Sequence, residues 1–133
     1  MRWHVRTTAA LAFVVTAGAA ASQHAAVAAD ARIGETIYSR CLACHALAYD
    51  RTGPRHCGLF GRRAGSVKGF AYSDAMKRSS IVWTEKTLDR FLANPLKMVP
   101  GTAMGYAGVA SSKERADLIA YLKEANASAQ CRS

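Results

Sequence analysis

Cys41-Leu42-Ala43-Cys44-His45 is the stretch of this 133-residue chain that decides its fold. Two cysteines separated by two residues and followed at once by a histidine form the attachment signature of a c-type haem. Both thiols can add to the vinyl groups on one edge of a haem, and that geometry places the next side chain, His45, under the iron as an axial ligand. The motif therefore predicts two covalent tethers, at Cys41 and Cys44, and one coordination bond.

A bare pair of cysteines at this spacing also occurs in thioredoxin-like redox proteins and in zinc sites. A thioredoxin-like pair is expected near alternating strands and helices, and the sequence has no such alternation. A zinc site needs two more ligands at short spacing, and downstream only the adjacent His56 and Cys57 are present. The surrounding residues therefore favour the haem.

Residues 1–29 have the order of a secretory signal peptide. Arg2 and Arg6 come first, a mostly alanine apolar run covers 9–21, and small residues lead up to Ala29. This order is typical of a segment removed on export, with cleavage expected at 28/29 or 29/30. A retained membrane anchor is the alternative, but the apolar run is short for a membrane span. We expect residues 30–133 to form the exported, periplasmic protein.

The 104 residues from 30 to 133 suffice for one small domain, with the haem at the centre of its core. The net charge of +9 falls to +7 when Arg2 and Arg6 are lost with the leader. A basic surface suits nucleic acid, an anionic membrane or an acidic protein. The sequence has no nucleic-acid motif, and export argues against DNA. We expect a monomer that docks redox proteins with acidic surfaces, such as membrane reductase or oxidase complexes or a periplasmic dehydrogenase.

Apolar spacing and capping residues predict an all-α domain of about three to five helices and no strand. The expected helices cover 32–41, 73–78, 85–93 and 111–127, and the glycine-rich stretch 46–72 is expected to fold over the haem as a compact loop. Ser111 and Glu114 match a capping box, and Pro95 is expected to end the third helix. The first and last helices are expected to pack together. Gly34 then lies near a helix start or at a close crossing.

Sequence blocks spread over nearly the whole predicted mature chain resemble the small class I cytochrome c proteins. After the haem motif these blocks are Gly53-Pro54, Gly58-Leu59-Phe60-Gly61-Arg62, Gly69 to Ala75, Trp83, Asn94-Pro95, Pro100 to Met104 and Asp117 to Leu122. The resemblance implies a small cytochrome c-like fold around one haem c, in an electron-transfer protein that is not an enzyme. It also implies that Met104 is the second axial ligand. The competing thioethers, Met76 and Met98, lie outside the Pro-Gly-Thr loop.

The resemblance implies further roles around the haem. The Pro54 carbonyl would accept the Nδ1 hydrogen of the axial histidine and so fix its ring. Tyr72 and Trp83 would donate hydrogen bonds to a buried haem propionate, with Arg62 as a nearby positive charge. The alternative for these three is aromatic core and a solvated arginine; a buried propionate needs such partners, which favours the first interpretation.

Three more positions bear on the methionine side of the haem. One lies in the loop that carries Met104, and two depart from the family pattern. Thr102 lies in that loop, two residues before Met104. Phe91 stands where many relatives have a tyrosine that hydrogen-bonds the methionine sulfur, and Met76 stands where many have an asparagine. We therefore expect the methionine side of the haem to be drier than in those relatives.

Three further residues need a separate interpretation. Two of them lie in the glycine-rich stretch 46–72, and the third lies near the C-terminus. Cys57 and Cys131 are the spare thiols of an exported domain, and we expect a disulfide between them, with unpaired thiols or intermolecular pairing as the alternatives. His56 stands where relatives often have an apolar residue against the haem. We interpret it as a surface or hydrogen-bonded histidine, with unintended iron ligation as the alternative.

The sequence thus predicts an exported one-electron carrier that uses a His45/Met104-ligated covalent haem c and shuttles electrons between redox proteins. Two alternatives belong to other classes. One is a haem peroxidase or gas-binding protein, which would require Met104 to be displaced from the iron. The other is an electron-entry subunit of a larger dehydrogenase or oxidase complex. A respiratory chain, a photosynthetic pathway and the oxidation of small compounds are all compatible with the sequence as the pathway of this carrier.

Overall fold

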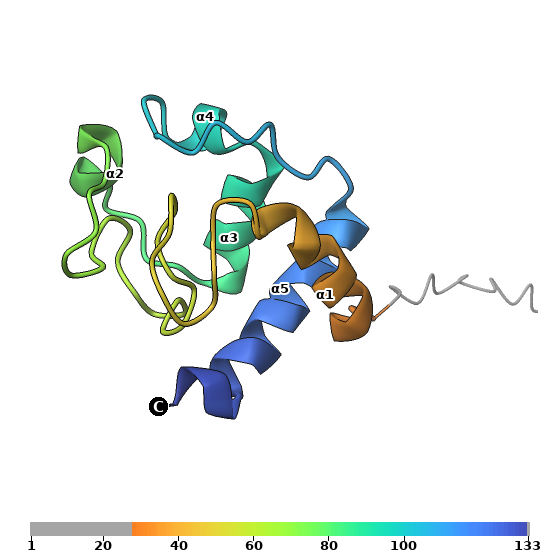
Figure 1. Ribbon diagram of the computed structural model, residues 1–133. Helices are drawn as coiled ribbons and strands as arrows, with labels where there is room; N and C mark the ends of the chain where they lie inside the picture. The colour runs from red at the N-terminus through yellow and green to blue at the C-terminus, as the bar shows by residue number, and fades with distance from the viewer. Residues whose placement is uncertain (1–27, 133) are drawn as a thin grey trace, which may run out of the picture.

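The computed structural model describes residues 28–132, so the predicted signal peptide lies outside these residues except for its last two positions. Five α-helices and two short 3₁₀ helices follow one another along the described chain (Figure 1). The α-helices are α1 (Ala31–Tyr38), α2 (Asp74–Arg78), α3 (Glu85–Ala93), α4 (Pro95–Met98) and α5 (Ser112–Ala127), and the 3₁₀ helices are Ser39–Cys41 and Ala129–Cys131. Between 28 and 132 the only β-type pairing is an isolated bridge between Arg63 and Val82. The predicted all-α class is therefore confirmed.

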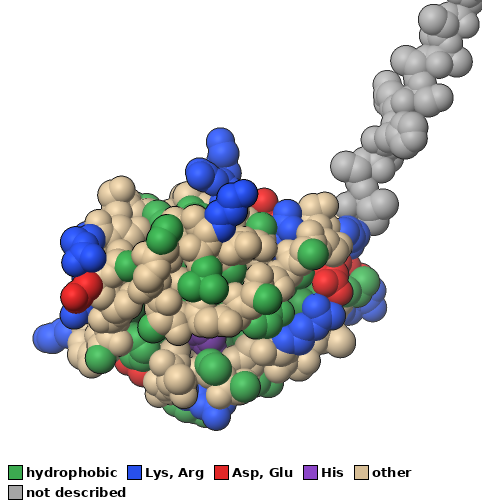
Figure 2. Space-filling view, turned by 90° about the horizontal axis from the view of Figure 1, so that it is seen from above, with side chains coloured by type: hydrophobic (Ala, Val, Ile, Leu, Met, Phe, Trp, Pro, Cys, Tyr) green, Lys and Arg blue, Asp and Glu red, His purple; other side chains and the backbone are tan. Residues whose placement is uncertain are grey.

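One hydrophobic cluster joins the inner faces of α1, α3 and α5. Its members from α3 are Leu88, Phe91 and Leu92, the face that the helical spacing predicts. Charged side chains lie outside it, and Figure 2 shows Lys and Arg around the rim of the face seen from the α2 and α4 side. None of the helices in the described part of the chain has the length and apolar character needed to cross a membrane.

Helices α1 and α5 cross closely although they lie at opposite ends of the described chain (Figure 1). The crossing point is Gly34, which is buried in α1. An added Cβ at Gly34 would lie 2.0 Å from the backbone oxygen of Asp117 and 2.8 Å from Cβ of Tyr121. The glycine therefore lets two helix backbones approach more closely than any side chain would permit.

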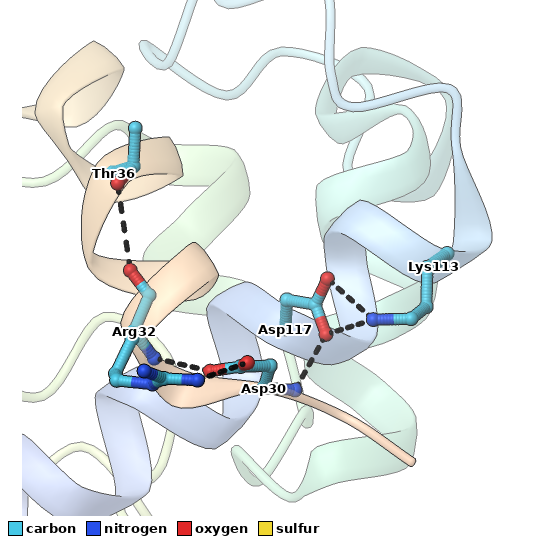
Figure 3. Close-up of polar contacts among 5 residues, drawn as sticks. All are labelled: Asp30, Arg32, Thr36, Lys113 and Asp117. Atoms are coloured by element: carbon cyan, nitrogen blue, oxygen red, sulfur yellow. Dashed lines mark hydrogen bonds and ion pairs between the residues drawn. The ribbon is translucent and has the colours of Figure 1, made fainter. Parts of the chain in front are cut away.

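Asp117 anchors the start of α1 to α5 (Figure 3). Its side chain is 2% exposed, and its Oδ1 accepts a 2.7 Å hydrogen bond from the backbone N–H of Asp30, the residue that caps α1. Lys113, one helical turn earlier on α5, donates to both carboxylate oxygens at 2.6 and 2.8 Å. The Lys113 hydrogen bond and the Asp30 N–H together hold the pKa of Asp117 below its ordinary value of 3.8.

We expect Asp117→Asn to lower stability at neutral pH, because the amide loses the ion pair with Lys113 while it can still accept from Asp30. Because the pKa of Asp117 is lower in the folded protein than its ordinary value of 3.8, the Asp117 carboxylate contributes its full stability above pH 3.8. This contribution is lost as the pH falls through the pKa of the folded protein. The difference between the two proteins should therefore shrink in acid, as chemical denaturation at several pH values will show. Asp74→Asn is the control, since its pair with Lys77 is solvent-exposed; an equal loss there would contradict the role of Asp117.

Side-chain caps begin the remaining helices. Ser73 caps α2 by accepting from the N–H of Met76, and Thr84 forms a reciprocal capping box with Thr87 at the start of α3.

Two expectations about helix ends need correction, the role of Pro95 and the capping box at Ser111. Pro95 does not only end α3: with Asn94 as the cap it begins the short helix α4, because proline is favoured at a first helical position.

The capping box predicted at the start of α5 is half formed. Ser111 does accept from the N–H of Glu114, at 3.2 Å. The Glu114 carboxylate does not reach back to Ser111, because it forms a two-pronged ion pair with Arg40 at 3.0 and 3.2 Å. This ion pair is a second polar contact between the first and last helical segments, in addition to that of Asp117 with Asp30.

The chain end is fixed by a disulfide between Cys57 and Cys131, which are 74 residues apart in sequence. It links the last 3₁₀ helix to the loop that follows the CxxCH motif. A crosslink that closes so long a loop typically contributes about 2–4 kcal/mol by restricting the unfolded chain.

Candidate functional site

The CxxCH motif lies in a tight turn at the end of the first helical segment. Cys41 ends the 3₁₀ helix, and its carbonyl accepts from the N–H of Cys44 at 3.1 Å and of His45 at 2.9 Å. The turn gathers both thiols and the imidazole within one short segment. Neither Cys41 nor Cys44 forms a disulfide.

His45 presents one ring nitrogen to the protein and leaves the other available. Its Nδ1 lies 2.8 Å from the carbonyl oxygen of Pro54, and because a carbonyl only accepts, Nδ1 carries the hydrogen. Burial lowers the pKa of the His45 ring, so the imidazole is neutral at neutral pH. In this tautomer Nε2 has a free lone pair, which is what a metal ligand requires.

Gly53 brings the Pro54 loop against the His45 ring. The Gly53 N–H donates to the carbonyl of Cys44 at 2.7 Å. An added Cβ at Gly53 would lie only 2.3 Å from Cε1 of His45. The loop can therefore approach the ring edge only because this residue has no side chain.

Arg62 is held with one polar atom unpaired. Its Nη1 and Nη2 donate to the carbonyls of Cys57 and Arg55, both at 2.9 Å. Its Nε is buried without a hydrogen-bond partner in the chain, and burial lowers the pKa of the guanidinium. A buried, unpaired N–H of a cation suits an anionic group that the polypeptide does not supply, such as a haem propionate.

The two aromatic residues predicted to serve the propionate lie near Arg62. Trp83 is buried, and its backbone N–H donates to the Arg62 carbonyl at 2.9 Å. Tyr72 interacts electrostatically with Arg62, and burial raises the pKa of its hydroxyl, which therefore keeps its proton as a donor. The Trp83 ring also contacts that of Phe91, with ring centroids 5.0 Å apart, and both residues belong to the hydrophobic cluster.

Met104 lies in the loop between α4 and α5, partly buried against the core. Its backbone N–H lies 3.3 Å from Oγ1 of the buried Thr102, which fixes the local turn. The competing methionines lie elsewhere: Met76 is buried in α2, and Met98 ends α4. Among the three, only Met104 is carried by an irregular loop.

The structure also gives contacts beside His45 to three residues, His56, Tyr38 and Gly53, to which the sequence assigned no such role. His56 was expected to be a surface or hydrogen-bonded histidine, and the structure shows it half-buried. Its Nδ1 is hydrogen-bonded to the Tyr38 hydroxyl at 3.0 Å. Its ring also stacks on that of His45. Tyr38 showed only helical apolar spacing, and Gly53 belonged to the Gly53-Pro54 block of the family resemblance without a role of its own, so no local signal indicated these contacts.

These features fit a covalently attached haem. Two unpaired thiols, an imidazole with a free Nε2, a glycine that admits the ring and a buried cationic N–H are the groups that a haem c requires. In the space-filling view a histidine side chain is visible among hydrophobic side chains in the middle of the face (Figure 2).

Known proteins resemble the chain over most of its length. The family model described as Cytochrome c matches residues 31–126. The chain is 46% identical over 111 residues to a cytochrome c2 from Blastochloris viridis, covering 81% of this chain and 87% of that protein. It is 55% identical over 96 residues to a cytochrome c from Tetrahymena pyriformis, covering 71% and 87%. The solved structure of cytochrome cH from Methylobacterium extorquens superposes with a TM-score of 0.70 at 42% identity, covering 71% of this chain and 98% of that one.

Proposed function

The chain belongs to the cytochrome c family, and from this premise we propose that it is an exported one-electron carrier whose haem is tethered by Cys41 and Cys44 and ligated by His45 and Met104. Haem c with its iron is the cofactor, and proteins of this family are electron carriers rather than enzymes. The haem supplies the one-electron chemistry by alternating between its ferric and ferrous states. The chain's own residues bind it, orient its ligands and exclude water.

The observation that carries the proposal is the His45 hydrogen bond. Because Pro54 accepts the Nδ1 hydrogen at 2.8 Å, the ring is fixed with Nε2 free to donate its lone pair to an iron. A ligand histidine with such a partner is oriented and made more basic. His45 thus needs little rearrangement to remain bound in both oxidation states.

Met104 would supply the second iron ligand through its thioether sulfur. Thioether ligation favours ferrous iron and raises the reduction potential, which suits a carrier. A six-coordinate site also leaves no open position for a peroxide or a gas. Arg62, Tyr72 and Trp83 would hold a buried propionate, which is costly to bury without charged or hydrogen-bonding partners.

Export and partner choice follow from sequence and charge. Cleavage at 28/29 or 29/30 would release a periplasmic protein with a net charge of +7, down from +9 for the full chain. Lys and Arg on the surface would then steer acidic redox partners and make association faster at low salt. Membrane reductase or oxidase complexes and periplasmic dehydrogenases have the chemistry to be such partners.

The far-red sulfur-to-iron absorption band of the oxidised protein tests the proposed ligation. We expect the band in the unmutated protein and its loss in Met104→Ala, because alanine removes the only sulfur that the proposal places on iron. Met98→Ala is the matched control, since Met98 is also partly buried but ends α4, and it should keep the band. A missing band in the unmutated protein would overturn the proposal.

A further inference from the structure

His45 has a second neighbour besides Pro54. The ring of His56 stacks on the His45 ring with centroids 4.3 Å apart and planes inclined by 23°. His56 lies only two residues after Pro54, so one loop supplies both the carbonyl at Nδ1 and the flat surface against the ring. A stacked ring restricts rotation of His45 about its own side-chain bonds in a way that a single hydrogen bond does not.

Tyr38 holds His56 from the end of α1. The Tyr38 side chain is 3% exposed, and its hydroxyl lies 3.0 Å from Nδ1 of His56. Both side chains can take part in this hydrogen bond, since a tyrosine hydroxyl can donate and accept and an imidazole nitrogen can do either. In either direction the hydrogen bond fixes the orientation of the His56 ring relative to α1.

The backbone of His56 is fixed from two directions. Its N–H points at the carbonyls of Ala46 and Leu47, at 3.1 and 3.0 Å, in the segment that directly follows His45. The next residue, Cys57, donates to Leu47 at 2.7 Å and is bonded to Cys131. The His56 ring is thus held at its backbone by the disulfide-linked loop and at its tip by Tyr38.

We propose that Tyr38 and His56 act as a positioning pair for the axial ligand: the Tyr38 hydroxyl orients His56, and the His56 ring fixes the orientation of His45 and adds a polar group beside it. This inference rests on the proposed function, because it takes His45 as the iron ligand. A polar ring beside the ligand stabilises the more highly charged ferric state, and a fixed imidazole donates more strongly to iron. Both effects lower the reduction potential relative to an aliphatic neighbour.

The test compares His56→Leu and Tyr38→Phe in the haem-loaded protein by midpoint potential and by NMR of the hyperfine-shifted His45 ring protons in the ferric state. For His56→Leu we expect the ratio of ferrous to ferric protein at a fixed potential to rise about threefold. This corresponds to a midpoint potential about 28 mV higher, at 59 mV per tenfold. The His45 ring resonances should also be displaced. Tyr38→Phe should shift both readouts in the same direction by less, because the His56 ring stays in place but loses its partner.

Tyr121→Phe is the matched control, since its ring also contacts Tyr38, at a centroid distance of 5.1 Å, and it should leave both readouts unchanged. If His56→Leu fails to incorporate haem, Tyr38→Phe still decides, because it keeps the packing of the ring. Readouts of Tyr38→Phe equal to those of Tyr121→Phe would overturn the pair. Absence of hyperfine-shifted imidazole resonances in the unmutated protein would instead refute His45 as the ligand, and with it the proposed function.

Discussion

Alanine in place of Gly34 is expected to lower the free energy of unfolding by about 3 kcal/mol, the upper part of the range for overpacked sites. Helix propensity alone predicts the opposite, a gain of about 1 kcal/mol for alanine over glycine inside a helix. The crossing decides the sign, because the new Cβ would lie 2.0 Å from the Asp117 backbone oxygen and 2.6 Å from its carbonyl carbon. Neither atom can move without separating α1 from α5.

Chemical denaturation of Gly34→Ala measures this loss. Gly105→Ala is the matched control, since no atom of the described chain lies within 4 Å of a Cβ there and the backbone is not in the left-handed region. The control should change stability by no more than about 0.5 kcal/mol. A Gly34→Ala protein as stable as the control would show that the two helices are not in close contact in solution.

Gly53→Ala is expected to disturb the iron site directly. The added methyl would lie 2.3 Å from Cε1 and 2.6 Å from Nδ1 of His45, so the ring must turn or the loop must withdraw. Either movement breaks the hydrogen bond to Pro54, and the loss of such a supporting contact typically costs 10- to 100-fold in affinity or activity at metal sites. We expect a mixture of ligation states in the ferric protein and a loss of about 3 kcal/mol from overpacking and the broken hydrogen bond.

Absorption and NMR spectra of the ferric protein, with denaturation, report both effects of Gly53→Ala. Gly105→Ala serves again and is a strict control, because it lies beside the proposed ligand Met104. Native spectra in Gly53→Ala would contradict the close approach of the loop to His45.

Local signals were enough to predict most of the helices. Ser73 and Thr84 are caps in the structure, as their positions before apolar spacing predict. The spacing of Leu88, Phe91 and Leu92 predicts the buried face of α3 correctly. These features depend on residues within one or two turns, and the sequence displays them directly.

The packing of the first helix on the last and the Cys57–Cys131 disulfide were expected from the sequence, but the individual polar and ring contacts between distant segments were not. Glu114 matches a local capping pattern, but Arg40, 74 residues away, competes for its carboxylate. The return of the Pro54 loop to His45 was expected from the resemblance, but the stacking of His56 on the His45 ring was not, because no residue type signals it. Asn94 and Pro95 do carry the signature of a helix start, and the error there was to interpret proline only as a terminator.

The disulfide between Cys57 and Cys131 also determines which thiols remain available to the haem. Four cysteines can pair in three ways, and in an unfolded chain the thiols closest in sequence meet most readily. Cys41 and Cys44 are the nearest pair, and joining them would block haem attachment. The native partners are 74 residues apart, and α5 brings the chain end that holds Cys131 to the loop that holds Cys57. Pairing Cys57 with Cys131 therefore takes up the two other thiols and leaves both thiols of the motif free for the haem.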